Sequence, residues 1–195
     1  MEKYIERTLV LIKPDAVLRG LTFEILLRFE QAGLKIVAMK MLRASREIVE
    51  RHYPNTIEWI EGMGNKTLNL YKEYNKNPQN ELGTANPREI GEMVKDWNID
   101  YLVSGPMIAC VIEGIHAIDV VRKMCGNTMP RYAEAGTIRG SFSSTSAIVA
   151  NANRRAVKNL IHASSNEGEA EHEIACWFTP QEIISYSRTD EGELY

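Results

Sequence analysis

Four short clusters of polar residues have the types and spacing of a site that binds phosphate groups. They are Lys13-Pro14-Asp15, Arg122 followed by Gly126-x-Thr128-x-Pro130, Gly136-Thr137-Ile138-Arg139-Gly140, and Asn159-x-x-His162-x-Ser164. Cations and hydroxyls bind phosphate oxygens, and an imidazole can act as a nucleophile toward phosphorus. A carboxylate, Glu173, follows the histidine by eleven residues. The residue types therefore favour a site that holds phosphate groups, with an imidazole and a carboxylate close to it in the sequence.

The usual glycine-rich phosphate cradles are absent from this sequence. Neither G-x-x-x-x-G-K-[ST] nor G-x-G-x-x-G occurs, and Gly64-Asn65-Lys66-Thr67 matches only the end of the first pattern. If a nucleotide binds here, side chains must hold its phosphates instead of backbone amides.

Taken in order, the four clusters resemble the nucleoside diphosphate kinase family. The similarity covers residues 7–53, 104–142 and 159–180, and it includes Arg19-Gly20, His52-Tyr53 and Ser104-Gly105-Pro106. The resemblance implies an enzyme with ping-pong kinetics. Such an enzyme passes the γ-phosphate of a nucleoside triphosphate, typically ATP, to a nucleoside diphosphate through a phosphohistidine at His162.

The same resemblance implies roles for the other site residues. Glu173 is expected to aim the ring of His162, with Ser164 supporting the carboxylate. Lys13 and Tyr53 are expected to contact the transferred phosphate and the region of the sugar hydroxyl. The implied nucleotide-binding residues are Lys13, Arg122, Thr128, Arg139 and Asn159, the last of them at the ribose. Mg²⁺ is the expected cofactor, held mainly by the nucleotide phosphates and water, with no certain protein ligand.

Three departures from the family pattern concern the same site. The motif His-Gly-Ser-Asp reads His162-Ala163-Ser164-Ser165, which removes a carboxylate near the metal's water shell. Arg-Gly-Asp-Phe carries a serine, Ser141, in place of the aspartate. The Arg-Pro-Phe-Phe segment, which clamps the base and a phosphate, has no clear equivalent. The stacking residue therefore stays open among Trp59, Val94 and Trp97.

Alternating strands and helices are expected to position these clusters. Strands are predicted over 8–13, 34–42, 106–113 and 159–162, and helices over 20–33, 45–52, 116–124 and 167–178. This order predicts an α+β fold, a ferredoxin-like sandwich whose four-stranded antiparallel sheet carries helices on one face. In the first helix, Phe23, Leu26 and Leu27 are expected to share the buried face, with Ile25 as a further candidate.

The whole chain, 1–195, is predicted to form one domain with two insertions. The first covers about 54–103 and contains helical patterns near 68–74 and over 87–97. The second covers about 143–157. Both are expected at the surface, because the entropy cost of closing a loop grows slowly with its length.

Composition limits the classes of partner. A formal net charge of −3 over 195 residues argues against broad nucleic-acid binding, which needs a basic face. No apolar run approaches the roughly 20 residues that cross a bilayer. Cys110, Cys125 and Cys176 lack the spacing of a metal site or a disulfide framework, so we expect a cytoplasmic protein. The resemblance further implies a homo-oligomer, either a hexamer or a tetramer.

Two other classes of function remain to be compared with the structure. A nucleotide sensor without turnover would explain Ser165 and the missing clamp segment. An RNA-binding module of the same topology would need exposed aromatic side chains on the sheet, where the predicted strands instead carry mainly aliphatic residues.

Overall fold

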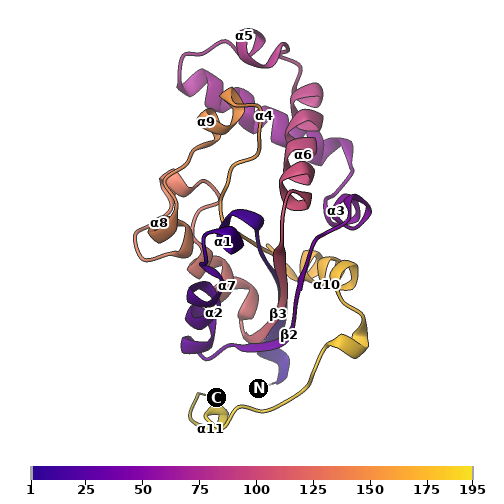
Figure 1. Cartoon of the computed structure of the whole chain (residues 1–195), viewed down its shortest axis with the longest axis vertical. Helices are drawn as coiled ribbons and strands as arrows, with labels where there is room; N and C mark the ends of the chain where they lie inside the picture. Colours follow the sequence, from indigo (N-terminus) through magenta and orange to yellow (C-terminus); the bar gives the residue numbers. More distant parts are fainter. Residues whose placement is uncertain (1, 195) are drawn as a thin grey trace.

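A four-stranded antiparallel sheet forms the centre of the computed structural model, which describes residues 2–194 (Figure 1). The strands are β1 (Ile5–Ile12), β2 (Lys35–Leu42), β3 (Met107–Ile115) and β4 (Ile161–Ala163), in the order β2-β3-β1-β4. Every neighbouring pair is antiparallel. The predicted ferredoxin-like α+β sandwich is therefore confirmed.

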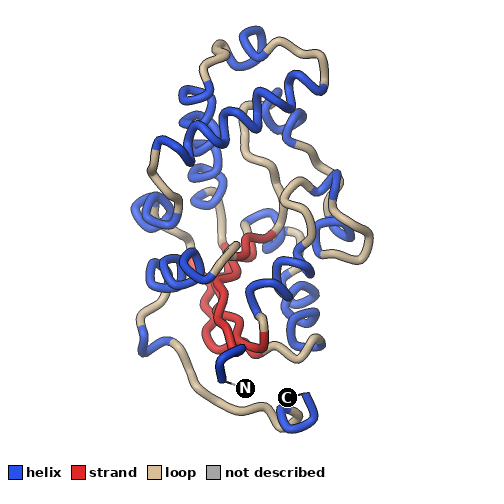
Figure 2. Tube along the Cα trace, turned by 180° about the vertical axis from the view of Figure 1, so that it is seen from behind, coloured by secondary structure: helices blue, strands red, loops and turns tan. Residues whose placement is uncertain are grey.

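Helices connect the strands and extend the molecule beyond the sheet (Figure 2). They are α1 (Pro14–Leu18), α2 (Thr22–Gln31), α3 (Arg46–His52), α4 (Ile57–Glu73), α5 (Pro78–Leu82), α6 (Pro87–Val103), α7 (Ala117–Cys125), α8 (Ile138–Phe142), α9 (Ala147–Ala152), α10 (Glu167–Trp177) and α11 (Glu191–Leu194). Within the described residues, none of them has both the length and the apolar character needed to span a bilayer.

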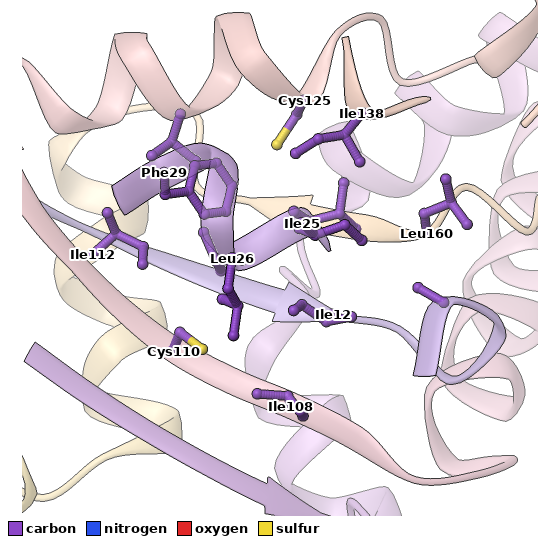
Figure 3. Close-up of a cluster of buried hydrophobic side chains, with 14 of the residues drawn as sticks. Ile12, Ile25, Leu26, Phe29, Ile108, Cys110, Ile112, Cys125, Ile138 and Leu160 are labelled. Atoms are coloured by element: carbon purple, nitrogen blue, oxygen red, sulfur yellow. The ribbon is translucent and has the colours of Figure 1, made fainter. Parts of the chain in front are cut away.

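Both faces of the sheet are covered, so the expectation of helices on one face is wrong. The central strand β1 has fully buried residues pointing each way. Val10 and Ile12 pack in the cluster with α2 and α7, which Figure 3 shows in part. Leu9 and Leu11 pack in the cluster with α3, α6 and α10. A strand that is apolar on both sides needs cover on both sides.

The buried face of α2 also differs from the prediction. Ile25, Leu26 and Phe29 are buried in the first core cluster (Figure 3), whereas Phe23 is 78% exposed and Leu27 is 46% exposed. Residues three and four apart share a helix face, so 25, 26 and 29 form one stripe. Phe23 and Leu27 form a second apolar pair on the outer face.

Helices α4 and α6 pack closely as a hairpin at one end of the molecule (Figure 1). Gly64 and Gly91 make the approach possible. A Cβ on Gly64 would lie 1.7 Å from the carbonyl oxygen of Pro87, and one on Gly91 would lie 2.0 Å from that of Ile60. Side chains from the hairpin, α5 and α9 form a separate small core of Tyr71, Leu82, Ile90 and Ile148.

The segment 54–103 is only partly a surface addition. Its predicted helical patterns are confirmed as α4 and α6, but α6 runs on to Val103. Ile99 and Leu102, near the end of α6, are buried against the sheet. The end of this segment therefore belongs to the core, because its apolar positions continue the helical stripe onto β1 and β3.

Candidate active site

His162 lies on β4, next to a carboxylate from α10. Its Nε2 is 2.9 Å from Oε2 of Glu173, and the hydroxyl of Ser164 donates to the same oxygen over 2.6 Å. Because the carboxylate accepts, the imidazole proton lies on Nε2 and the lone pair on Nδ1. Glu173 and Ser164 are 5% and 0% exposed, so the ring of His162 is positioned by buried side chains.

The imidazole of His162 is neutral at pH 7. Desolvation lowers the pKa of His162, and the neighbouring charges of Lys13 and Arg139 lower it further. The side chain still keeps 22% of its surface exposed. A ring that is neutral, oriented and reachable has the properties of a nucleophile.

A kink in the backbone before β4 places Asn159 next to Lys13. Leu160 has φ 71°, and the amide of Ile161 donates to the carbonyl of Asn159 over 2.8 Å, which makes a tight three-residue turn. The amide of Lys13 donates to the carbonyl of Leu160 over 2.8 Å. The Nζ of Lys13 then donates to Oδ1 of Asn159 over 2.7 Å.

A cavity of about 370 Å³ opens beside the imidazole. We call it the first cavity. The predicted residues that line it are Lys13, Arg122, Thr128, Arg139, Asn159 and His162. Tyr53 lies outside this lining, while Ser164 and Glu173 hold the ring from behind. The cavity is thus a cationic enclosure facing one imidazole, and an anion in it would be attracted by several charges at once.

Arg139 fixes the walls of this cavity as well as supplying charge. Its guanidinium donates to the carbonyls of Asn159, Gly126 and Ile161 over 3.2, 2.6 and 2.7 Å. The side chain is 7% exposed. One buried guanidinium therefore ties the loop before α8 to the kink and to β4.

The charge of Lys13 depends on what lies in the cavity. Burial lowers its pKa to about 7, and the nearby Arg139 acts in the same direction. A polyphosphate anion beside the ammonium would raise the pKa again. A bound phosphate therefore favours the charged form of Lys13.

A second cavity, of about 410 Å³, continues from the first between the helical hairpin and α9. Four residues line both cavities: Lys13, Thr128, Asn159 and His162. The others that line the second cavity are Tyr53, Met63, Lys66, Thr67, Leu70, Val94, Trp97, Asn98, Met129, Ala147, Asn151, Arg155, Ala156 and Val157. A ligand can therefore extend from the cationic cavity into a largely apolar one.

The second cavity narrows the choice of stacking residue. Val94 and Trp97 line it, whereas Trp59 is absent from its described lining. The ring of Trp59 instead lies 5.9 Å from that of Tyr53. Tyr53 itself lines the second cavity, and its ring lies 4.9 Å from that of His52.

Several residues of the site escaped sequence reasoning. The Nδ1 of His52 accepts from the indole of Trp177 over 3.3 Å, and its ring lies 4.7 Å from that of His162. Burial lowers the pKa of His52 to about 3, so this imidazole is neutral as well. Glu169 lines the first cavity. Its only signal in the sequence was the spacing of four from Ser165, in the first turn of a predicted helix.

The fold and the first cavity place the chain among nucleotide phosphotransferases. A model of the nucleoside diphosphate kinase family matches residues 6–59 and 90–183. The chain belongs to the nucleoside diphosphate kinase family. It is an enzyme that transfers phosphoryl groups between nucleotides through a histidine intermediate, and enzymes of this class generally use a divalent metal.

Relatives and solved structures agree with this assignment. A nucleoside diphosphate kinase from Pyrobaculum aerophilum is 46% identical over 180 residues, covering 92% of this chain and 98% of the relative. One from Borreliella burgdorferi is 37% identical over 191 residues, covering 98% of each. The crystal structure of an NDP kinase from Pyrobaculum aerophilum has a TM-score of 0.90 at 45% identity, covering 93% of this chain and 100% of that one.

A further solved structure, that of a relative, contains a bound nucleotide. A transition state mimic of the Borrelia burgdorferi enzyme contains vanadate and ADP, with a TM-score of 0.77 at 36% identity, covering 98% of this chain and 97% of that one. The two other classes of function lose their support. The relatives are enzymes, and helices cover both faces of the sheet where an RNA-binding module needs exposed aromatic side chains.

Proposed function

We propose that His162 is the residue that carries the phosphoryl group in this chain. The observation that supports this most directly is a neutral imidazole with its Nε2 bound to Glu173, facing a cavity lined by Lys13, Arg122 and Arg139. In this arrangement the unprotonated Nδ1 is the atom that attacks.

Two displacements at phosphorus then complete the reaction. The Nδ1 lone pair forms a bond to the γ-phosphorus of a nucleoside triphosphate, typically ATP, and the bond to the β-phosphate oxygen breaks, releasing a diphosphate. Glu173 stabilises the positive charge that develops on the ring through the Nε2 proton. A terminal oxygen of a second nucleoside diphosphate next attacks the phosphohistidine, and the phosphorus–nitrogen bond breaks.

The remaining predicted residues position the nucleotide. Lys13 binds the transferred phosphate, and Arg122, Thr128 and Arg139 bind the other phosphates. Asn159 contacts the sugar, because it lies where the two cavities meet, and Tyr53 contacts the sugar from the wall of the second cavity. Positioning and charge neutralisation of this kind provide most of the catalysis in phosphoryl transfer.

A direct test is to label the enzyme with ATP carrying a radioactive γ-phosphate. We expect an acid-labile, base-stable phosphoprotein whose label maps to residue 162, since phosphoramidates hydrolyse in acid. The label should leave when a nucleoside diphosphate is added. A stable phosphoester, or a label on another residue, would contradict the assignment.

The donors in the first cavity fit Mg²⁺ held mainly by the nucleotide. In the described residues the cavity offers one carboxylate, Glu169, beside the hydroxyl of Ser165, too few oxygens for an all-protein site. Among the described residues, the side chains of His52, His162 and Glu173 lie close enough together to hold a metal ion. This group contains the proposed nucleophile, His162, and its partner, Glu173, so we do not assign the metal to it. The metal, when bound, neutralises phosphate charge.

Glu169 supplies the carboxylate that Ser165 removes from the family motif. Its Oε2 accepts from the amide of Ser165 over 2.9 Å and also from that residue's hydroxyl, which leaves Oε1 to accept from water on the metal. Replacing Glu169 by glutamine is expected to raise the Mg²⁺ concentration for half-maximal activity by roughly 10-fold, the lower end for outer ligands.

The control for this variant is Glu167→Gln, an exposed residue in the same helical turn. When activity is titrated against Mg²⁺ at fixed ATP, only the Glu169 variant should need a higher Mg²⁺ concentration for half-maximal activity. Equal titration curves would show that Glu169 does not serve the metal.

We also propose a single nucleoside diphosphate kinase-like domain with insertions at about 54–103 and 143–157, in a cytoplasmic homo-oligomer, hexamer or tetramer. The gap in the family match at 60–89 supports the first insertion. Exposed apolar side chains, Phe23, Leu27, Met39 and Met41, support an interface between subunits. The free cysteines agree with a reducing compartment.

A further inference from the structure

The second cavity has the volume and the largely apolar lining to hold a nucleobase. Its walls come from the hairpin through Leu70, Val94 and Trp97, and it meets the first cavity at four shared residues. With the phosphates of a nucleotide beside His162 and the ribose at Asn159, the nucleobase extends into this second cavity. This placement rests on the function proposed above.

One buried amide lines the second cavity without a partner of its own. Asn151, at the end of α9, is 5% exposed. Its backbone carbonyl accepts from the amide of Arg154 over 2.9 Å. In the described part of the chain its side-chain amide makes no hydrogen bond. The amide atoms are not themselves sealed off, because they line the cavity, and a ligand there can bond to them.

The position of Asn151 is fixed by packing and not by loop geometry. Ile148, one turn earlier on α9, is buried against Tyr71, Leu82 and Ile90. This contact docks α9 on the hairpin, and Figure 1 shows α9 lying beside α4. An amide on a docked helix keeps its place when a ligand enters, which is what a recognition group requires.

We propose that the side-chain amide of Asn151 hydrogen-bonds to the polar edge of the nucleobase. An amide carries one donor group and one acceptor and can present them in either order by rotating about its last bond. Every nucleobase has a neighbouring donor and acceptor on its edge. Asn151 therefore accepts purines and pyrimidines alike, while it selects against a ring without polar edge groups.

The test compares ATP with purine riboside triphosphate, which lacks the 6-amino group. We expect the native enzyme to be phosphorylated with a kcat/KM about 3- to 10-fold higher for ATP, the range of one neutral hydrogen bond. Asn151→Leu should lose this preference. Asn153→Leu is the matched control, because that exposed amide bonds back to the carbonyl of Val149 on the same helix.

A second variant, Asn151→Asp, separates loss of the hydrogen bond from a change in packing, because aspartate has nearly the same size and shape as asparagine. In Asn151→Asp the carboxylate only accepts, so guanine, whose ring N–H and 2-amino group are neighbouring donors, should gain about 3- to 10-fold over uracil, whose one ring N–H lies between two carbonyls. Unchanged base ratios in both Asn151 variants would overturn the proposal.

Inorganic tripolyphosphate separates this proposal from the function on which it rests. It has no base, so its inhibition of phosphoenzyme formation should be equal in the native enzyme and both Asn151 variants. Labelling of His162 that persists with unchanged base ratios would overturn only the role of Asn151. Loss of labelling in the native enzyme would overturn the proposed function itself.

Discussion

Replacing His162 with glutamine is expected to lower the turnover of ATP with a second nucleoside diphosphate by at least about 10⁴-fold, as for other removed nucleophiles. Glutamine fills a similar space but cannot form the covalent intermediate. Nucleotide binding should persist, because the cations of the first cavity remain. A coupled phosphotransfer assay and equilibrium binding of ADP measure the two properties separately.

His172→Gln is the control for this prediction. His172 is exposed on α10, and its Nε2 lies 2.9 Å from the backbone carbonyl of Arg51, outside the described lining of both cavities. Its turnover should equal that of the native enzyme. Substantial activity in His162→Gln, with ADP bound normally, would mean that the phosphoryl group passes directly between nucleotides.

Replacing Glu173 with glutamine is expected to reduce turnover by about 10²- to 10⁴-fold, by analogy with the loss of the orienting carboxylate in a catalytic triad. The hydroxyl of Ser164 donates to one oxygen of Glu173. With an amide in that place, its oxygen stays with Ser164 and its N–H groups face Nε2. The imidazole proton then moves to Nδ1, and the attacking lone pair is lost.

The appropriate comparison is Glu171→Gln, an exposed carboxylate on the same helix. The rate of phosphoenzyme formation in a single turnover should fall in the Glu173 variant, with nucleotide affinity preserved. A loss of only a few-fold would show that Glu173 is a structural acceptor for Ser164 and does not control the tautomer.

Local signals in the sequence predicted most of the secondary structure. Ser45, where the predicted helix 45–52 begins, accepts from the amide of Ile48 as the N-cap of α3. Gly126 ends α7 within two residues of the predicted end at 124. These predictions succeed because a cap or a turn depends on a few neighbouring residues. The face of α2 was wrong at Phe23 and Leu27, since composition alone does not say which of two apolar stripes meets the sheet.

By itself, the sequence determined the family, the fold class and the chemistry. Four clusters, with Lys13, Arg122, Arg139 and His162 in that order along the chain, contained enough residue identity and spacing to define them. Phosphoryl transfer needs those groups whatever surrounds them, so their types are visible without coordinates.

The tertiary structure alone decided which residues line the two cavities. Trp97 and Asn151 line the same cavity although they are far apart in the sequence, because α4, α6 and α9 pack on one small core. Glu169 lines the first cavity and accepts from the amide of Ser165 because α10 begins beside β4. Contacts between distant segments depend on the free energy of packing over the whole fold, and no local pattern of residues encodes them.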